Sequence, residues 1–214
     1  MIETPDLLLT GPADAPVFIL LAHGAGAPMD TPFMTFFAEA LAGHGYGVVR
    51  FEFPYMARRR VEGGKRPPDR APVLLETWRA VIAEVRARFA PATLVIGGKS
   101  MGGRMASLIA AEDKVDGVVA LGYPFHAAGK PGYVERRLGH LPALAVPTLI
   151  CQGTRDSLGS RETVADIPMS PAVRVHWLED GDHSLKPRKA SGRTEAQNWT
   201  EAAEAIDAFI KGLA

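Results

Sequence analysis

The chain has 214 residues, and its 24 basic and 24 acidic side chains balance, which argues against binding to nucleic acid or to a membrane surface. A single cysteine, Cys151, excludes an internal disulfide, and with neither a signal-peptide pattern nor a membrane-spanning apolar run we expect a cytoplasmic protein. Because repeats and linker-like breaks are absent, residues 1–214 are expected to form a single domain.

The N-terminal part predicts a strand, a glycine-rich loop and a helix in succession. Residues 7–10 fit a short edge strand, and the apolar run 17–22 fits a strand that is buried on both faces. The loop at 23–28 reads His-Gly-Ala-Gly-Ala-Pro, and a helix that starts after Thr31 is expected to reach residue 42. His23 is expected to hydrogen-bond the backbone of its own loop and not to act as a base.

A strand at 47–53 leads into a segment rich in basic residues, and an amphipathic helix is expected at 71–89. We predict a long loop over 54–69, at the edge of a parallel sheet where ligands bind. Recognition of an anionic substrate and a solvated loop both stay open for the basic residues, and the pattern favours the second. Tyr55, at the start of this loop, is a candidate substrate contact. The basic side chains are Arg58, Arg59, Arg60, Lys65 and Arg66.

The strongest functional signal lies at residues 92–111. Residues 93–96 fit a buried strand, Gly98-Lys99-Ser100-Met101-Gly102 matches the strand-to-helix turn G-x-S-x-G, and apolar residues at helical spacing follow. Glycines remove Cβ atoms that would collide at such a turn, so Ser100 is expected to be presented at a helix N-terminus as a nucleophile. The other interpretation is a glycine-rich turn with a capping serine.

A strand at 115–122 is followed by a short cap-like segment, residues 126–146, in which one helical turn is expected at 133–138. His126 and Lys130 are candidate pocket residues, with a plain loop role as the alternative. This segment is too short to form a separate lid.

The last part of the chain predicts two strands and a helix. Strands at 147–153 and 173–178 end shortly before Asp156 and His183. Thr194-x-x-Gln197 fits a capping box that opens the final helix.

Ser100, Asp156 and His183 therefore follow one another in the order nucleophile, acid, histidine, each after a predicted strand. A serine hydroxyl needs a base at neutral pH, so His183 would take its proton while Asp156 orients the imidazole. Asp180 and Asp182 lie too close along the chain to His183 to approach its ring. An oxyanion hole is expected from the backbone N–H groups of Met101 and Ala25. Zinc-ligand spacing such as H-E-x-x-H is absent, so neither a metal nor a cofactor is predicted.

With these motifs the chain resembles the α/β-hydrolases over nearly its whole length, and more narrowly the bacterial relatives of testis-expressed protein 30. The motifs lie at 21–30, 53–56, 97–104, 122–126, 152–156 and 181–184. The resemblance implies a mostly parallel central sheet with helices on both faces, little or no lid, and Ser100, Asp156 and His183 in the triad positions. The chain is more distantly similar to dienelactone hydrolases, which carry a cysteine where this chain has Ser100.

The sequence thus predicts a serine hydrolase acting on a small-molecule acyl substrate, a carboxylic ester or thioester. Transfer of the acyl group to an acceptor other than water is not distinguished from hydrolysis. The alternative is a binding or scaffold protein that keeps the fold with little turnover, since the resembling group includes a subunit of a histone-acetyltransferase complex. Nothing in the sequence indicates a particular protein partner.

Overall fold

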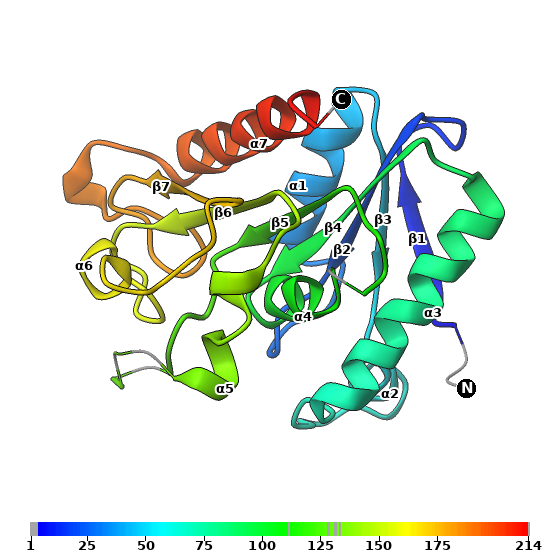
Figure 1. The fold of residues 1–214 in the computed structure, drawn as a ribbon, viewed down its shortest axis with the longest axis horizontal. Helices are drawn as coiled ribbons and strands as arrows, with labels where there is room; N and C mark the ends of the chain where they lie inside the picture. Colours follow the sequence, from blue (N-terminus) through cyan, green and yellow to red (C-terminus); the bar gives the residue numbers. More distant parts are fainter. Residues whose placement is uncertain (1–3, 111, 128, 131, 133, 214) are drawn as a thin grey trace.

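The computed structural model describes residues 4–110, 112–127, 129–130, 132 and 134–213. Within them the strands form one sheet in the order β1-β3-β2-β4-β5-β6-β7, and only β1 runs antiparallel to its neighbour (Figure 1). The strands are β1 (Leu7–Thr10), β2 (Val17–Ala22), β3 (Gly47–Phe51), β4 (Thr93–Lys99), β5 (Gly117–Leu121), β6 (Thr148–Gly153) and β7 (Val173–Leu178). This order agrees with the predicted, mostly parallel sheet.

Helices cover both faces of the sheet, with α1 and α7 on one side and α3 and α4 on the other (Figure 1). The α-helices are α1 (Pro32–Gly43), α2 (Pro54–Glu62), α3 (Ala71–Phe89), α4 (Met101–Ile109), α5 (Glu135–Leu138), α6 (Arg161–Val164) and α7 (Glu195–Lys211). In the part of the chain that is described, no helix is both long and apolar enough to cross a membrane.

Burial on both faces explains why the central strands are continuously apolar. In β2, Phe18 and Leu20 join the core under α3 and α4, whereas Ile19 and Leu21 join the core under α1 and α7. Successive side chains of a strand point to opposite faces, so a strand with helices on both sides has no polar side. The core under α1 and α7 includes an aromatic cluster, in which phenylalanine rings of α1 pack against Trp199 of α7.

The segment 54–69 corrects the predicted long loop, because its first part is the helix α2. Pro54 occupies the first turn, where its missing N–H costs nothing, and Tyr55 and Met56 are buried against the core. The helix ends at Gly63, whose positive φ of 74° suits glycine. The glycines and prolines after residue 62 favoured the prediction of a loop. The residues before them are helical because Tyr55 and Met56 are buried and because Arg60 forms ion pairs.

The described part of the cap-like segment 126–146 packs against the hydrophobic core that lies under α3 and α4. It contains the single helical turn α5 and a 3₁₀ turn at Leu141–Ala143, and Leu138, Leu141 and Leu144 are buried in the core. The predicted turn began at Tyr133, which lies outside the described residues, and α5 itself begins at Glu135.

Candidate active site

Ser100 occupies a strained turn between β4 and α4. Its φ of 51° and ψ of −114° are rare for a residue with a side chain, and the turn is held by a hydrogen bond of 3.0 Å from its N–H to the Leu121 carbonyl. A Cβ at Gly98 or at Gly102 would overlap the carbonyl oxygen of Ala22. The glycines of the motif are therefore required by the close approach of β2.

A chain of two hydrogen bonds joins the three residues at the ends of β4, β6 and β7. The distance between Ser100 Oγ and His183 Nε2 is 2.8 Å, and that between His183 Nδ1 and Asp156 Oδ2 is 2.7 Å. A carboxylate can only accept, so Nδ1 carries the ring proton and Nε2 is free to accept from the Ser100 hydroxyl. Asp156 is buried, while the Ser100 and His183 side chains are partly exposed.

The buried carboxylate of Asp156 is held by two further donors. Gln152, inside β6, donates from Nε2 to Asp156 Oδ2 at 2.8 Å, and the N–H of Leu158 donates to Oδ1 at 2.8 Å. Gln152 is itself fixed through the backbone of Tyr123, whose N–H it accepts at 2.6 Å. The sequence analysis assigned no role to Gln152. The available signal was a long amide side chain in a mainly apolar buried strand, because such a group needs partners.

The loop that carries His183 is fixed by its own carboxylates. Asp182 Oδ1 accepts the N–H groups of Ser184 at 2.7 Å and of Lys186 at 3.0 Å, closing a tight turn around the histidine. Asp180 forms ion pairs with Arg188 and Arg155, and the hydrogen bonds from Arg188 hold its pKa at about 2. Both carboxylates therefore bind backbone or arginine groups around the loop, and the printed partner of the His183 ring is Asp156.

Lys99 is a second site residue to which the sequence analysis gave no role. Its Nζ donates to the carbonyl oxygen of His183 and lies 5.0 Å from the ring centre of Phe33. Burial of the ammonium group lowers the pKa of Lys99 to about 8, although the charges of Asp156 and Asp182 oppose this shift.

The loop after β2 lies beside Ser100 and presents the predicted oxyanion donor Ala25. Met101, the other predicted donor, is the first residue of α4, where a helix leaves its N–H groups unbonded. Among the described residues, no acceptor is found for the backbone N–H of Met101 or of Ala25.

The structure places His23 as the sequence analysis expected and puts Tyr55 and His126 away from the cavity. His23 Nδ1 donates to the Gly24 carbonyl at 2.7 Å, and its Nε2 accepts the N–H of Phe53 at 3.1 Å. Tyr55 is buried behind the loop, with its hydroxyl 2.9 Å from the Ala25 carbonyl oxygen. His126 is also buried and bonds to Thr163 Oγ1 at 3.1 Å. Neither lines the cavity that Ser100 faces.

That cavity has a volume of about 460 Å³ and lies between the loop after β2, the start of α1 and the His183 loop. Its walls are mainly apolar, and Ser100, His183 and Lys99 are at one side. The lining residues are Gly24 to Pro28, Thr31, Phe33, Met34, Lys99, Ser100, His183 and Ser184. The described residues of the cap-like segment do not contribute to it, so the site has no lid from that part of the chain.

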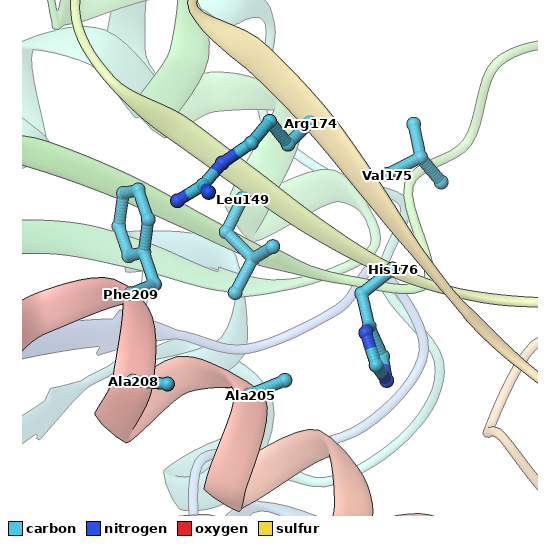
Figure 2. Close-up of a pocket in the computed structure, with 7 residues that line it drawn as sticks. All are labelled: Leu149, Arg174, Val175, His176, Ala205, Ala208 and Phe209. Atoms are coloured by element: carbon cyan, nitrogen blue, oxygen red, sulfur yellow. The ribbon is translucent and has the colours of Figure 1, made fainter. Parts of the chain in front are cut away.

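A hollow of about 420 Å³ lies elsewhere, between the edge strand β7 and α7 (Figure 2). There the guanidinium of Arg174 lies 5.7 Å from the ring centre of Phe209, and His176 contacts Glu201 at 3.1 Å. Its lining contains no serine, threonine or cysteine that could serve as a nucleophile. No group of three or more His, Cys, Asp or Glu residues in the described ranges is arranged to hold a metal ion.

Four arginines of segment 58–70 form ion pairs or hydrogen bonds. Arg60 contacts Glu52 at 2.6 Å and Asp30 at 2.9 Å, while Arg58 pairs with Asp69 at 2.9 Å. Arg66 pairs with Glu62 one turn earlier, and Arg59 donates to the Gly26 carbonyl. Of these contacts, those of Arg59 with Gly26 and of Arg60 with Asp30 attach α2 to the segment between β2 and α1.

The sheet order, the turn at Ser100 and the placement of a histidine after the last strand define the class of the α/β hydrolases. Residues 15–211 match the family described as an α/β hydrolase domain, and the chain belongs to this family. The resemblance to α/β-hydrolases is thereby confirmed, while the narrower one to the relatives of testis-expressed protein 30 stays a prediction.

Solved structures with the same fold include a serine hydrolase that is described as having no lid. A serine hydrolase without a lid from Xanthomonas campestris is 21% identical, with a TM-score of 0.71 over 95% of this chain and 88% of that one. A serine hydrolase homologue from Coxiella burnetii is 22% identical, with a TM-score of 0.71 over 100% and 95% of the two chains. A dienelactone hydrolase from Anabaena variabilis is 19% identical, with a TM-score of 0.71 over 92% and 88%.

In sequence, the chain is similar to the carboxymethylenebutenolidase of Pseudomonas putida. The identity is 29% over 99 residues, which are 44% of this chain and 39% of that enzyme. The similarity therefore spans well under half the length of this curated relative.

Proposed function

We propose that this protein is a serine hydrolase that cleaves small carboxylic esters or thioesters. The observation that supports the proposal is the hydrogen-bonded chain Ser100–His183–Asp156, which ends on a cavity. A buried carboxylate, a histidine with its acceptor nitrogen toward a hydroxyl, and a strained turn that exposes this hydroxyl are together the requirements for nucleophilic catalysis by serine.

The reaction follows from these contacts in two half-reactions. His183 Nε2 takes the proton of Ser100 as Oγ attacks the acyl carbon, and the imidazolium is stabilised by Asp156. The tetrahedral intermediate collapses, the C–O or C–S bond breaks, and the imidazolium returns the proton to the leaving alcohol or thiol. Water, deprotonated by the same histidine, then attacks the acyl-enzyme and releases the carboxylic acid.

The negative charge of the intermediate falls on the former carbonyl oxygen, which needs donors that are already in place. The N–H groups of Met101 and Ala25 are the donors that we assign. Both lie beside Ser100 and lack another acceptor among the described residues. Loss of one such donor typically lowers the rate about 100- to 1000-fold.

The dimensions and walls of the cavity favour a short acyl chain. Ala25, Phe33 and Met34 supply apolar walls, and about 460 Å³ holds a small ester together with its leaving group. The scaffold alternative would gain support from a blocked nucleophile, but Ser100 lines an accessible cavity. We propose action in the cytoplasm on a small-molecule substrate, without a cofactor.

The experiment is labelling of the purified protein with a fluorophosphonate, followed by mass spectrometry of the adduct. Wild type is compared with Ser100→Ala, His183→Ala and the control Ser107→Ala. Ser107 is a matched control because it also lies 2.8 Å from a histidine nitrogen, that of His140, but is buried outside the cavity.

We expect one adduct, on Ser100, that is abolished in Ser100→Ala, lost or greatly slowed in His183→Ala and kept in Ser107→Ala. Hydrolysis of acetate, butyrate and octanoate esters of one leaving group should then favour the short acyl chains. Absence of labelling in folded wild type would refute an activated serine, and faster turnover of octanoate would refute the size argument.

A further inference from the structure

Three consecutive carbonyl groups of the loop after β2 accept hydrogen bonds from α2. The Tyr55 hydroxyl lies 2.9 Å from the Ala25 oxygen and 3.4 Å from the Gly24 oxygen. Arg59, one helical turn further along, donates from a terminal nitrogen to the Gly26 oxygen at 2.9 Å. Residues four apart lie on the same face of a helix, so one face of α2 binds the whole turn.

The direction of these carbonyls fixes the direction of the neighbouring N–H groups. The described peptide bonds are all trans, and in a trans peptide the C=O of one residue points opposite to the N–H of the next. Since the oxygens of residues 24 to 26 face α2, the N–H groups of Ala25, Gly26 and Ala27 face away from it. Successive N–H groups that point the same way form a concave site for negative charge.

Among the described residues, α2 is the element whose side chains bond to all three of these oxygens. The residues of the turn are glycine and alanine, which restrict the backbone least. In the part of the chain that the structure describes, the His23 ring is the one group outside α2 that bonds to any of the three oxygens. Tyr55, by contrast, is immobilised: only 1% of it is exposed, its ring packs edge-on against His23, and its N–H donates to Asp69 at 2.8 Å. The rigid partner is therefore α2.

We propose that Tyr55 and Arg59 are positioning residues for the oxyanion hole, holding the carbonyls of residues 24 to 26 toward α2 so that the Ala25 N–H faces the reacting oxygen. The proposal rests on the proposed function, because it assigns a role within that reaction. This role for α2 differs from the binding of an anionic substrate. The side chains of α2 contact the loop on the side away from the cavity and do not line the cavity itself.

The test measures kcat and KM for the best short-chain ester with Tyr55→Phe, Arg59→Met and the double variant. We expect kcat to fall about 10-fold in Tyr55→Phe and about 100-fold in the double variant, within the loss typical for one oxyanion donor, and KM to change less than 3-fold. Arg59→Lys, which keeps a donor, should recover part of the loss of Arg59→Met. Affinity for a trifluoromethyl ketone, which forms a charged tetrahedral adduct, should fall in parallel with kcat.

Two control variants separate positioning from general destabilisation. Tyr46→Phe removes another buried tyrosine hydroxyl, which donates to Asp207 at 2.7 Å. Arg79→Met removes an arginine of helix α3 that pairs with Glu112. Both should keep kcat within 2-fold at a similar loss of thermal stability. Unchanged kcat in the Tyr55 and Arg59 variants, or a rise in KM alone, would overturn the proposal, since KM alone indicates direct substrate contact.

A measurement that needs no turnover distinguishes failure of this proposal from failure of the proposed function. Residual dipolar couplings of the amides of residues 25 to 27 report the directions of their N–H bonds. These couplings should change in the double variant and stay unchanged in Tyr46→Phe. If they do change while wild type neither hydrolyses esters nor binds fluorophosphonate, α2 still orients the turn and only the hydrolase function fails. Unchanged couplings refute the positioning role, whatever the activity.

Discussion

Replacing Gln152 by glutamate tests the short hydrogen bond that Gln152 donates to the Asp156 carboxylate. The substitution keeps the shape of the side chain, and the oxygen that accepts the Tyr123 N–H is retained. In place of Nε2, however, an oxygen would lie 2.8 Å from Asp156 Oδ2 and 3.0 Å from the Gly159 carbonyl oxygen. Both neighbours are acceptors, so the introduced carboxyl fits only when it carries a proton to donate.

The magnitude follows from the spacing. Two negative charges 2.8 Å apart repel by about 6 kcal/mol at an effective dielectric constant of about 20. At about 1.4 kcal/mol per pKa unit, this repulsion raises the pKa of the introduced carboxyl in the folded protein far above the ordinary glutamate value of about 4.3. An acid whose pKa is raised by folding destabilises the fold as the pH rises above its unfolded pKa, up to the folded pKa.

At pH 5 the expected loss relative to wild type is about 1 kcal/mol, and at pH 7 it is about 4 kcal/mol. For a chain of this size these losses lower Tm by roughly 2–4 °C and 8–16 °C. The assay is thermal unfolding followed by circular dichroism from pH 5 to pH 8, with Gln197→Glu as the control, because Gln197 caps α7 on the surface. If Gln152→Glu and Gln197→Glu showed the same pH dependence, the contact between Gln152 and Asp156 would be wrong.

Two further outcomes are expected from other parts of the structure. Burial and then the charge of Arg104 lower the pKa of His140 to about 4, so stability is present above the unfolded pKa of about 6.5 and falls as the pH drops from 6.5 toward 4. Because His140 is partly exposed, the loss of stability is limited to about 2 kcal/mol. The variant His140→Gln should not show this loss. If the urea midpoint shifted equally between pH 7 and pH 5 in wild type and His140→Gln, the role of His140 would be contradicted. Phe33→Ala enlarges the cavity beside Ser100 and should raise kcat/KM for hexanoate relative to acetate esters on the order of tenfold, and an unchanged ratio would show that the acyl chain lies elsewhere.

The sequence by itself determined the features that depend on local pattern. Unbroken apolar runs such as that at 17–22 require a strand with both faces covered, and the glycines around Ser100 require a turn with no room for Cβ atoms. The placement of Asp156 and His183 after successive strands followed from the same patterns, because parallel strands bring their carboxyl ends to one edge of the sheet. Their hydrogen bonding could be expected from this, but its distances could not.

Tertiary structure alone decided the features that depend on neighbours far apart in the chain. Segment 54–62 is helical because it packs on the core and pairs with Asp30, which lies outside any local window of its sequence. Tyr55 bonds behind the loop because it is buried from solvent and the fold brings the carbonyls of Gly24 and Ala25 beside its hydroxyl. Gln152 is fixed by the Tyr123 backbone on the neighbouring strand, and Lys99 reaches the His183 carbonyl, through contacts that are likewise distant in the chain. A local pattern fixes which backbone is allowed, whereas the partner of a buried polar group is set by what the fold brings beside it.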